Sequence, residues 1–387
     1  MAFQNNYVEF VKRPEAAPTP DVFRMNKRTT PELNSGEFLV KNIYLSIDPA
    51  LVGRMRDESN YAESVQVGEA MHCYGIGQVI ETKNEKVQKG ELRLGRFDMQ
   101  EYTLCNNADD SSKINIGLAE PTWYLSIAGI TGLTAFFAIR DICKPKRGET
   151  IVVSAGASSV GMIAAQLAKR LGCRTIAIVS TDEKAQALRH SYAYDDAVSY
   201  RGKDSKTLSA DLSKVCPNGV DIYFDNTSGD ISEALLDLYN DFARIAVIGR
   251  LGISHLADTR LDVGRRDNNL VLSKRITKKG MVLLDYKKQY PEAIIQLAGM
   301  AHRKELQFEE DILSGINELP TAFFRVLAGK NTGKQLVKVG DINSAIDPSP
   351  VKLGNIIRSK KGLNKLIANS LKVARTVTSL TNSRKLP

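Results

Sequence analysis

The sequence from about Thr131 onward alternates between short apolar runs and longer stretches with helical periodicity. A helical pattern at 161–171 separates the first two apolar runs. Strands that are apolar throughout and separated by helices are typical of a parallel sheet covered on both faces. We therefore predict an α/β fold with a doubly wound parallel sheet. The four apolar runs lie at 150–154, 174–179, 221–225 and 243–249.

The ends of the chain have a different pattern. Residues 1–125 contain short alternating runs broken by Gly, Pro and Asn, which is typical of a β-rich domain. Residues 310–347 resume this pattern after the α/β part. We therefore predict that 1–125 and 310–347 form one domain and that 126–309 form a second domain between them.

The net charge of +9 is concentrated in the tail at 348–387, which holds nine Lys and Arg residues and no acid. The rest of the chain is neutral overall, so no nucleic-acid partner is expected for the body. Within the tail, apolar residues at 353–380 fall on one side at helical spacing and most bases fall opposite, which predicts an amphipathic helical extension. This helix could dock on the body or a partner subunit, lie on anionic lipid as a peripheral membrane contact, or bind an acidic protein or a nucleic acid.

Apolar content and cysteine spacing bear on the location of the protein. No stretch approaches the roughly 18 to 20 uninterrupted apolar residues of a membrane helix, and the N-terminus lacks the apolar core of a secretory signal. We therefore expect a cytoplasmic location. The five cysteines form no CxxC pair and the four histidines are scattered, so we expect reduced, mostly buried thiols and no metal site.

The turn at 154–161 joins the first predicted strand to the first predicted helix. At this position in a doubly wound fold, helix N-terminal N–H groups meet the pyrophosphate of a dinucleotide. The turn is built from small residues, with Gly156 and Gly161 at its two ends, which lets the backbone approach a phosphate. The Ser158 and Ser159 hydroxyls are candidate phosphate donors. A plain strand–helix turn is the alternative.

The end of the second predicted strand indicates which dinucleotide is bound. NAD sites usually place an acid there to hold the ribose 2′-hydroxyl. Here the strand ends in Ser180 and Thr181, and the nearest acid is followed closely by Lys184. The ammonium of Lys184 could neutralise a 2′-phosphate, so the sequence favours NADP over NAD. The alternative is that Lys184 is an ordinary solvated lysine.

Beyond these motifs, the chain resembles the zinc-independent medium-chain dehydrogenase/reductases, and among them the leukotriene B4 dehydrogenase, prostaglandin reductase and alkenal double-bond reductase group. The resemblance covers nearly all of 1–340 and consists of short matches in consistent order. The matching segments are 44–49, 53–55, 68–69, 75–79, 100–102, 132–135, 144–150, 223–226 and 331–337.

This resemblance implies a GroES-like β-rich domain, a Rossmann domain that binds NADPH, and a homodimer. It implies that 158–161 bind the pyrophosphate, that Lys184 and Tyr200 surround the 2′-phosphate, and that Asn226 lies near the adenosine ribose. Gly249 and 281–283 would border the cofactor, with Asn331 close to the nicotinamide. The full implied cofactor set is Thr134, Ser158, Ser159, Val160, Gly161, Lys184, Tyr200, Asn226, Gly249, Met281, Val282, Leu283 and Asn331.

The resemblance also implies the reaction. Zinc enzymes of the wider superfamily carry a cysteine-rich lobe and a Gly-His-Glu segment, and this sequence has neither. The implied reaction is hydride transfer from NADPH to the β-carbon of an enone or enal, followed by protonation of the α-carbon. Quinones are a related class of acceptor.

The sequence departs from the family pattern where substrate is handled. Ala50 and Val52 stand where relatives often have a tyrosine and an arginine, and the loop at 250–256 lacks the usual tyrosine. Tyr61 and His255 are then the candidate proton or hydrogen-bond donors, with Tyr286 as a further hydroxyl; packing, cofactor lining or a solvated loop are the alternatives. A second hypothesis is an NADP-binding protein with little catalysis, tethered by its tail to a membrane or partner.

Overall fold

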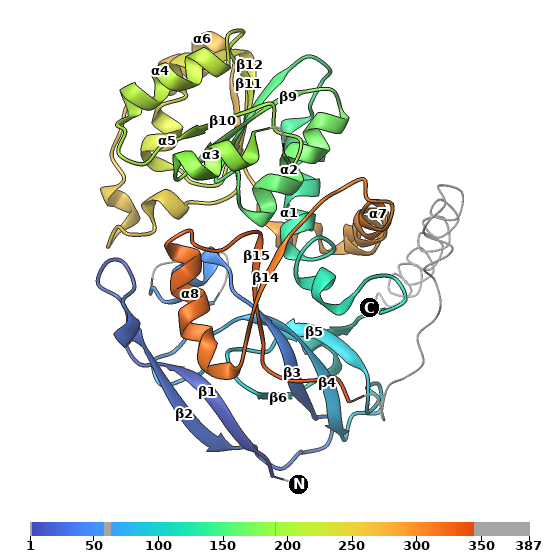
Figure 1. The fold of residues 1–387 in the computed structure, drawn as a ribbon. Helices are drawn as coiled ribbons and strands as arrows, with labels where there is room; N and C mark the ends of the chain where they lie inside the picture. The colour runs from blue at the N-terminus through green and yellow to red at the C-terminus, as the bar shows by residue number, and fades with distance from the viewer. Residues whose placement is uncertain (1, 58–62, 190, 344–387) are drawn as a thin grey trace, which may run out of the picture.

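The computed structural model describes residues 2–57, 63–189 and 191–343. Figure 1 shows two domains, with a parallel sheet in the upper one and a mixed sheet in the lower one. Tyr61 and the tail at 348–387, with its predicted helix at 353–380, lie outside the described residues. Within the described ranges, no helix combines the length and the apolar character needed to cross a membrane.

The upper domain is built on six parallel strands in the order β10-β9-β8-β11-β12-β13. The strand order reverses between β8 and β11, as in a Rossmann fold, so the predicted doubly wound sheet is confirmed. The strands are β8 (Thr150–Ser154), β9 (Arg174–Val179), β10 (Asp196–Ser199), β11 (Val220–Asp225), β12 (Tyr239–Val247) and β13 (Thr277–Gly280).

Successive side chains of the central strands are buried on opposite faces of this sheet. In β8, Ile151 and Val153 pack on one face and Val152 packs on the other, and all three are fully buried. This pattern requires helices on both faces. The first face is covered by α1 (Ile130–Ala138), α2 (Ser159–Arg170), α3 (Asp182–Leu188) and α7 (Tyr290–His302), and the second by α4 (Ser205–Val215), α5 (Gly229–Glu233) and α6 (Asn268–Lys274).

The lower domain is built from both ends of the chain. Its seven-stranded mixed sheet runs β14-β15-β3-β4-β5-β7, with β6 also paired to β3. The antiparallel pairing of β15 with β3, in which Leu336 faces Ser46, joins the late segment to the early one (Figure 1). The elements are β1 (Gln4–Phe10), β2 (Phe23–Thr29), β3 (Phe38–Ser46), β4 (Tyr74–Thr82), β5 (Leu92–Arg96), β6 (Tyr102–Cys105), β7 (Ser111–Lys113), β14 (Glu310–Ser314), α8 (Leu319–Leu327) and β15 (Lys334–Lys338).

Helix α7 ties the two domains together. Ile295 and Ala298 of α7 are buried against Ile43, Ile76 and Leu92 of the mixed sheet. Burial of apolar area of this kind is the main favourable term in domain association. The junction therefore holds the carboxyl edge of the parallel sheet against the lower domain.

Candidate functional site

A buried tyrosine, Tyr194, supports the turn between β8 and α2. The Tyr194 hydroxyl lies 3.0 Å from the Gly156 carbonyl oxygen and 3.0 Å from that of Gly161. A side chain at Gly156 would meet the Ala177 Cβ at 2.7 Å, so the turn packs directly on β9. The close packing leaves the outer side of the turn to a ligand.

The two serines of the turn make different contacts. Ser158 is the N-cap of α2, and its Oγ accepts the Gly161 N–H at 3.1 Å. The Ser159 hydroxyl is buried and donates to Thr131 Oγ1 at 3.1 Å. Both hydroxyls form hydrogen bonds within the protein. Backbone N–H groups and the positive end of the α2 dipole are therefore the groups that can bind an anion.

The carboxyl end of β9 is rich in cationic and hydroxyl groups. The Lys184 ammonium is partly buried, and burial lowers its pKa, with the nearby positive charge of Arg201 lowering it further. The nearest acid, Asp182, accepts the Ser199 hydroxyl, so its carboxylate is already engaged. Half-buried Tyr200 follows β10 and donates its backbone N–H to the Val179 carbonyl at 2.9 Å. The next acid, Glu183, is exposed, and its pKa is lowered by a hydrogen bond with the Thr181 side chain and by the Arg201 charge. With both carboxylates engaged, the two adjacent cations favour a bound anion here.

Residues 328–333, which we call the return loop, connect α8 to β15 and carry Asn331. At one end the Gly329 carbonyl accepts the Lys184 ammonium. At the other end Gly333 forms a β-bridge with Ser158 in the turn before α2. Asn331 lies between them, and its amide donates to the Gly333 carbonyl at 2.9 Å. The return loop of the lower domain therefore contacts both the 2′-phosphate end and the pyrophosphate turn of the predicted site.

The remaining predicted cofactor residues stand at the carboxyl ends of the next strands. Asn226 follows β11, and its side-chain amide donates to the Ser154 carbonyl at 2.7 Å. Gly249 follows β12 and approaches Asn226 so closely that a side chain would meet its carbonyl at 2.9 Å. Met281, Val282 and Leu283 follow β13, and Met281 is buried. Half-buried Thr134 lies on α1. The structure thus places Asn226, Gly249 and 281–283 of the predicted cofactor set at one edge of the sheet.

The structure describes two of the predicted donors, His255 and Tyr286. Tyr61 lies outside the described residues, and His255 is exposed on the loop after β12. Tyr286 stacks on Phe137 with ring centroids 4.5 Å apart. The loop that carries His255 is anchored by the lower domain, because the Arg56 guanidinium donates to the Ser254 carbonyl at 2.9 Å.

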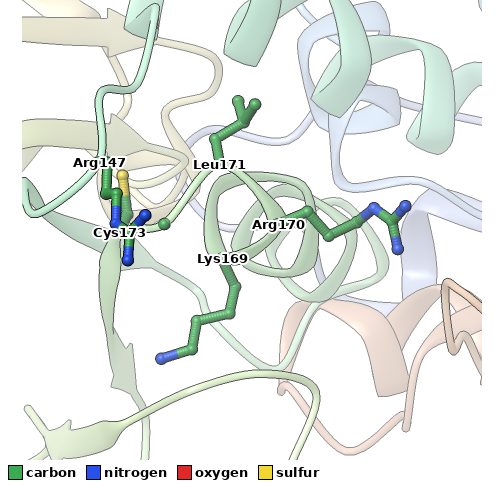
Figure 2. A pocket seen from close by; sticks show the side chains of 6 residues that line it. Arg147, Lys169, Arg170, Leu171 and Cys173 are labelled. Carbon is green, nitrogen blue, oxygen red and sulfur yellow. The ribbon is translucent and has the colours of Figure 1, made fainter.

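A surface hollow at the opposite edge of the sheet contains none of the predicted site residues. Figure 2 shows it at the C-terminal end of α2, lined by Arg147, Lys169, Arg170, Leu171, Gly172 and Cys173. Lys169 is paired with Asp195 and Arg170 with Glu305, so these cations serve the fold.

Cysteine burial agrees with the sequence. All five cysteines are free and buried, which confirms that prediction, and burial raises the pKa of the Cys105 thiol to about 12. In the part of the chain that the structure describes, no three His, Cys, Asp or Glu side chains gather closely enough to hold a metal ion.

Comparison with known proteins defines the class. Residues 6–114 match a family model described as the N-terminal domain of oxidoreductase, and 159–299 match one described as zinc-binding dehydrogenase. The chain belongs to the medium-chain dehydrogenase/reductases, in the zinc-independent group of NADP-dependent double-bond reductases. The family predicted from the sequence is confirmed.

Individual relatives match along most of their length. The NADP(+)-dependent 2-alkenal reductase of Nicotiana tabacum is 34% identical over 81% of this chain and 90% of its own. The NADPH-dependent curcumin reductase of Escherichia coli (strain K12) is 32% identical over 84% of this chain and 94% of its own. The crystal structure of CurA in complex with NADPH from Vibrio vulnificus has a TM-score of 0.80 and 30% identity, covering 87% of this chain and 99% of that one.

Three residues of the candidate site were not found from the sequence. Arg201 directly follows Tyr200, so its position after a predicted site residue is a usable signal. Gly329 acts through its backbone carbonyl and Tyr194 through a long-range contact with the turn. Neither contact leaves a pattern in the sequence.

Proposed function

We propose that this protein is an NADPH-dependent reductase of the C=C bond of α,β-unsaturated carbonyl compounds, with quinones as a related acceptor. The observation that carries the proposal is the end of β9, where Lys184 and Arg201 lie close together while Asp182 is held by Ser199. An NAD site usually places an acid on the ribose at this position. The other acid here, Glu183, is engaged by the Thr181 side chain and by the Arg201 charge. The named relatives that use NADP and reduce alkenals and curcumin support the same conclusion.

The residues at the carboxyl edge of the parallel sheet fit the cofactor. The small-residue turn before α2 would hold the pyrophosphate, and Lys184 with Tyr200 would hold the 2′-phosphate. Gly249, 281–283 and Asn331 would border the nicotinamide, which supplies a hydride when NADPH is bound. Reduction adds that hydride to the β-carbon and a proton to the α-carbon. The chain must orient the acceptor, exclude water and donate a hydrogen bond to the carbonyl oxygen as negative charge develops there.

The test is to follow NADPH absorbance with a panel of 2-alkenals, enones and quinones. We expect consumption of NADPH with at least one class and little consumption of NADH. If NADPH binds but no acceptor oxidises it, the reductase proposal is wrong. The second candidate, a weakly catalytic NADP-binding protein, then remains, as the altered residues Ala50 and Val52 would suggest.

We also propose that the chain forms a homodimer in the cytoplasm. Strand β13 supports a dimer because it lies at the edge of the sheet and all four of its residues are exposed. Light scattering of the purified chain tests the dimer. A peripheral membrane contact through 353–380 is tested by liposome sedimentation against a chain that ends at Asp347.

A further inference from the structure

Tyr290 is the first residue of helix α7, which packs on both domains. Its hydroxyl donates to the Leu283 carbonyl at 2.8 Å. Burial raises the pKa of Tyr290 to about 12, and the neighbouring Tyr74 hydroxyl contributes to the rise. Tyr74 is 40% exposed, and its hydroxyl makes no hydrogen bond with another described residue.

The position of Tyr74 is fixed by strand register. Tyr74 begins β4 and pairs with Ser46, the last residue of β3. Two residues further on, Asp48 forms an ion pair with Lys334. Lys334 directly follows Gly333, which bridges to the turn before α2. This end of the mixed sheet therefore lies against the phosphate-binding turn of the upper domain.

The position of Leu283 is fixed by the parallel sheet. Leu283 ends the segment 281–283, which continues from β13, and the Met281 N–H donates to the Val247 carbonyl at 3.0 Å. Ligands of doubly wound folds bind outside the carboxyl ends of the strands, where this segment lies. The Leu283 carbonyl therefore stands at the candidate site, and Tyr290 is the side chain that holds it.

We propose that Tyr290 is a positioning residue for hydride transfer. Its hydroxyl fixes the Leu283 carbonyl and so holds the segment 281–283 beside the nicotinamide. This inference rests on the proposed function. Tyr290 neither gains nor loses a proton in the reaction, because its high pKa keeps it a neutral donor at physiological pH. Hydride transfer depends steeply on the distance and alignment of the reacting atoms. Greater mobility of the segment 281–283 therefore lowers kcat more than it weakens NADPH binding.

The substitution Tyr290→Phe removes only the hydroxyl. The ring keeps its contact with Phe137, whose centroid lies 6.3 Å away. Tyr124→Phe is the matched control, because the Tyr124 hydroxyl also donates to a backbone carbonyl at 2.8 Å, that of Asn115, and burial also raises its pKa to about 12. A general effect of removing a half-buried hydroxyl that donates to a carbonyl would affect both variants alike.

The experiment measures kcat and KM with 2-cyclohexenone and NADPH, the NADPH Kd by calorimetry, and the melting temperature. We expect Tyr290→Phe to lower kcat about tenfold, with the NADPH Kd within about twofold of the wild type and a fall in melting temperature similar to that of Tyr124→Phe, since each variant loses one hydrogen bond. Tyr124→Phe should keep kcat within about twofold. A wild-type kcat in Tyr290→Phe, or equal losses in the two variants, would overturn the proposal.

A second measurement separates this inference from the proposed function. If the wild type fails to oxidise NADPH with any acceptor of the panel, the proposed function fails. The fluorescence of bound NADPH still reports on the surroundings of the nicotinamide in that case. Tyr290→Phe should then change the intensity and anisotropy of that fluorescence, whereas Tyr124→Phe should not. Identical spectra for the wild type and Tyr290→Phe would show that Tyr290 does not position this end of the site.

Discussion

Replacement of Lys184 by alanine should weaken binding of NADPH and leave NADH almost unaffected. In the structure the Lys184 ammonium donates to the Gly329 carbonyl, and its pKa is lowered by burial and by Arg201. A charge-assisted bond to a 2′-phosphate contributes about 1.5–3 kcal/mol, and the carbonyl contact given up costs about 0.5–1.5 kcal/mol. The net loss should be about 1–2 kcal/mol, or roughly 5- to 30-fold in Kd.

Calorimetric titration with NADPH and NADH measures this difference. The matched control is Lys89→Ala, which removes an exposed lysine from the connection between β4 and β5 in the lower domain. Arg201→Ala should shift the NADPH Kd in the same direction as Lys184→Ala. Equal weakening of both cofactors by Lys184→Ala would refute the reasoning, because NADH lacks the phosphate that Lys184 is proposed to read.

Three further changes probe the fold and the loops around the site. Burial raises the pKa of Asp98 to about 7, so between about pH 4 and about pH 7 the native state holds a proton that the unfolded chain has lost. The free energy of unfolding should therefore decrease as the pH rises from about 4 to about 7. Asp98→Asn should remove this pH dependence in urea titrations. Asparagine suits this position because Asp98 has a φ of 60°. Tyr194→Phe should lower the free energy of unfolding by about 1–2 kcal/mol and weaken NADPH binding, since the Gly156 and Gly161 carbonyls lose their hydroxyl neighbour; an unchanged urea midpoint would contradict this. Arg56→Ala should release the loop at 250–257 and speed its hydrogen exchange several-fold; equal exchange in both proteins would argue against the anchor.

Four of the six strands of the upper domain were predicted, because these strands are mostly apolar and buried on both faces. The runs at 150–154 and 174–179 have the same bounds as β8 and β9, whose interior residues are apolar except for Thr175. The short strand β10 has only two apolar residues and was not predicted. Strand β13 has the sequence Thr-Lys-Lys-Gly and was not predicted, because an exposed edge strand needs no apolar pattern. Strand β12 begins at Tyr239, four residues before the predicted run at 243–249. Of these four residues, only Tyr239 pairs with β11, and the stretch is too polar to be recognised as a strand.

The resemblance to the family predicted Asn226 and Gly249 as cofactor residues. The structure places both after strands of the parallel sheet, at the edge where ligands of doubly wound folds bind. Contacts made by backbone carbonyls or across domains depend on tertiary packing and leave no local pattern. The Gly329 carbonyl at Lys184 and the Leu283 carbonyl at Tyr290 are of this kind.

The return loop of the lower domain contacts Lys184, the residue proposed to read the 2′-phosphate, so the proposed nucleotide specificity depends on both domains. A chimera that grafts 126–309 onto the lower domain of a relative would carry Lys184 and Arg201 but would receive a foreign partner for the ammonium in place of Gly329. The graft should bind NADPH less selectively than its parent unless 328–333 are transferred with it. Exchange of coenzyme preference by engineering therefore has to treat these separated segments as a single unit.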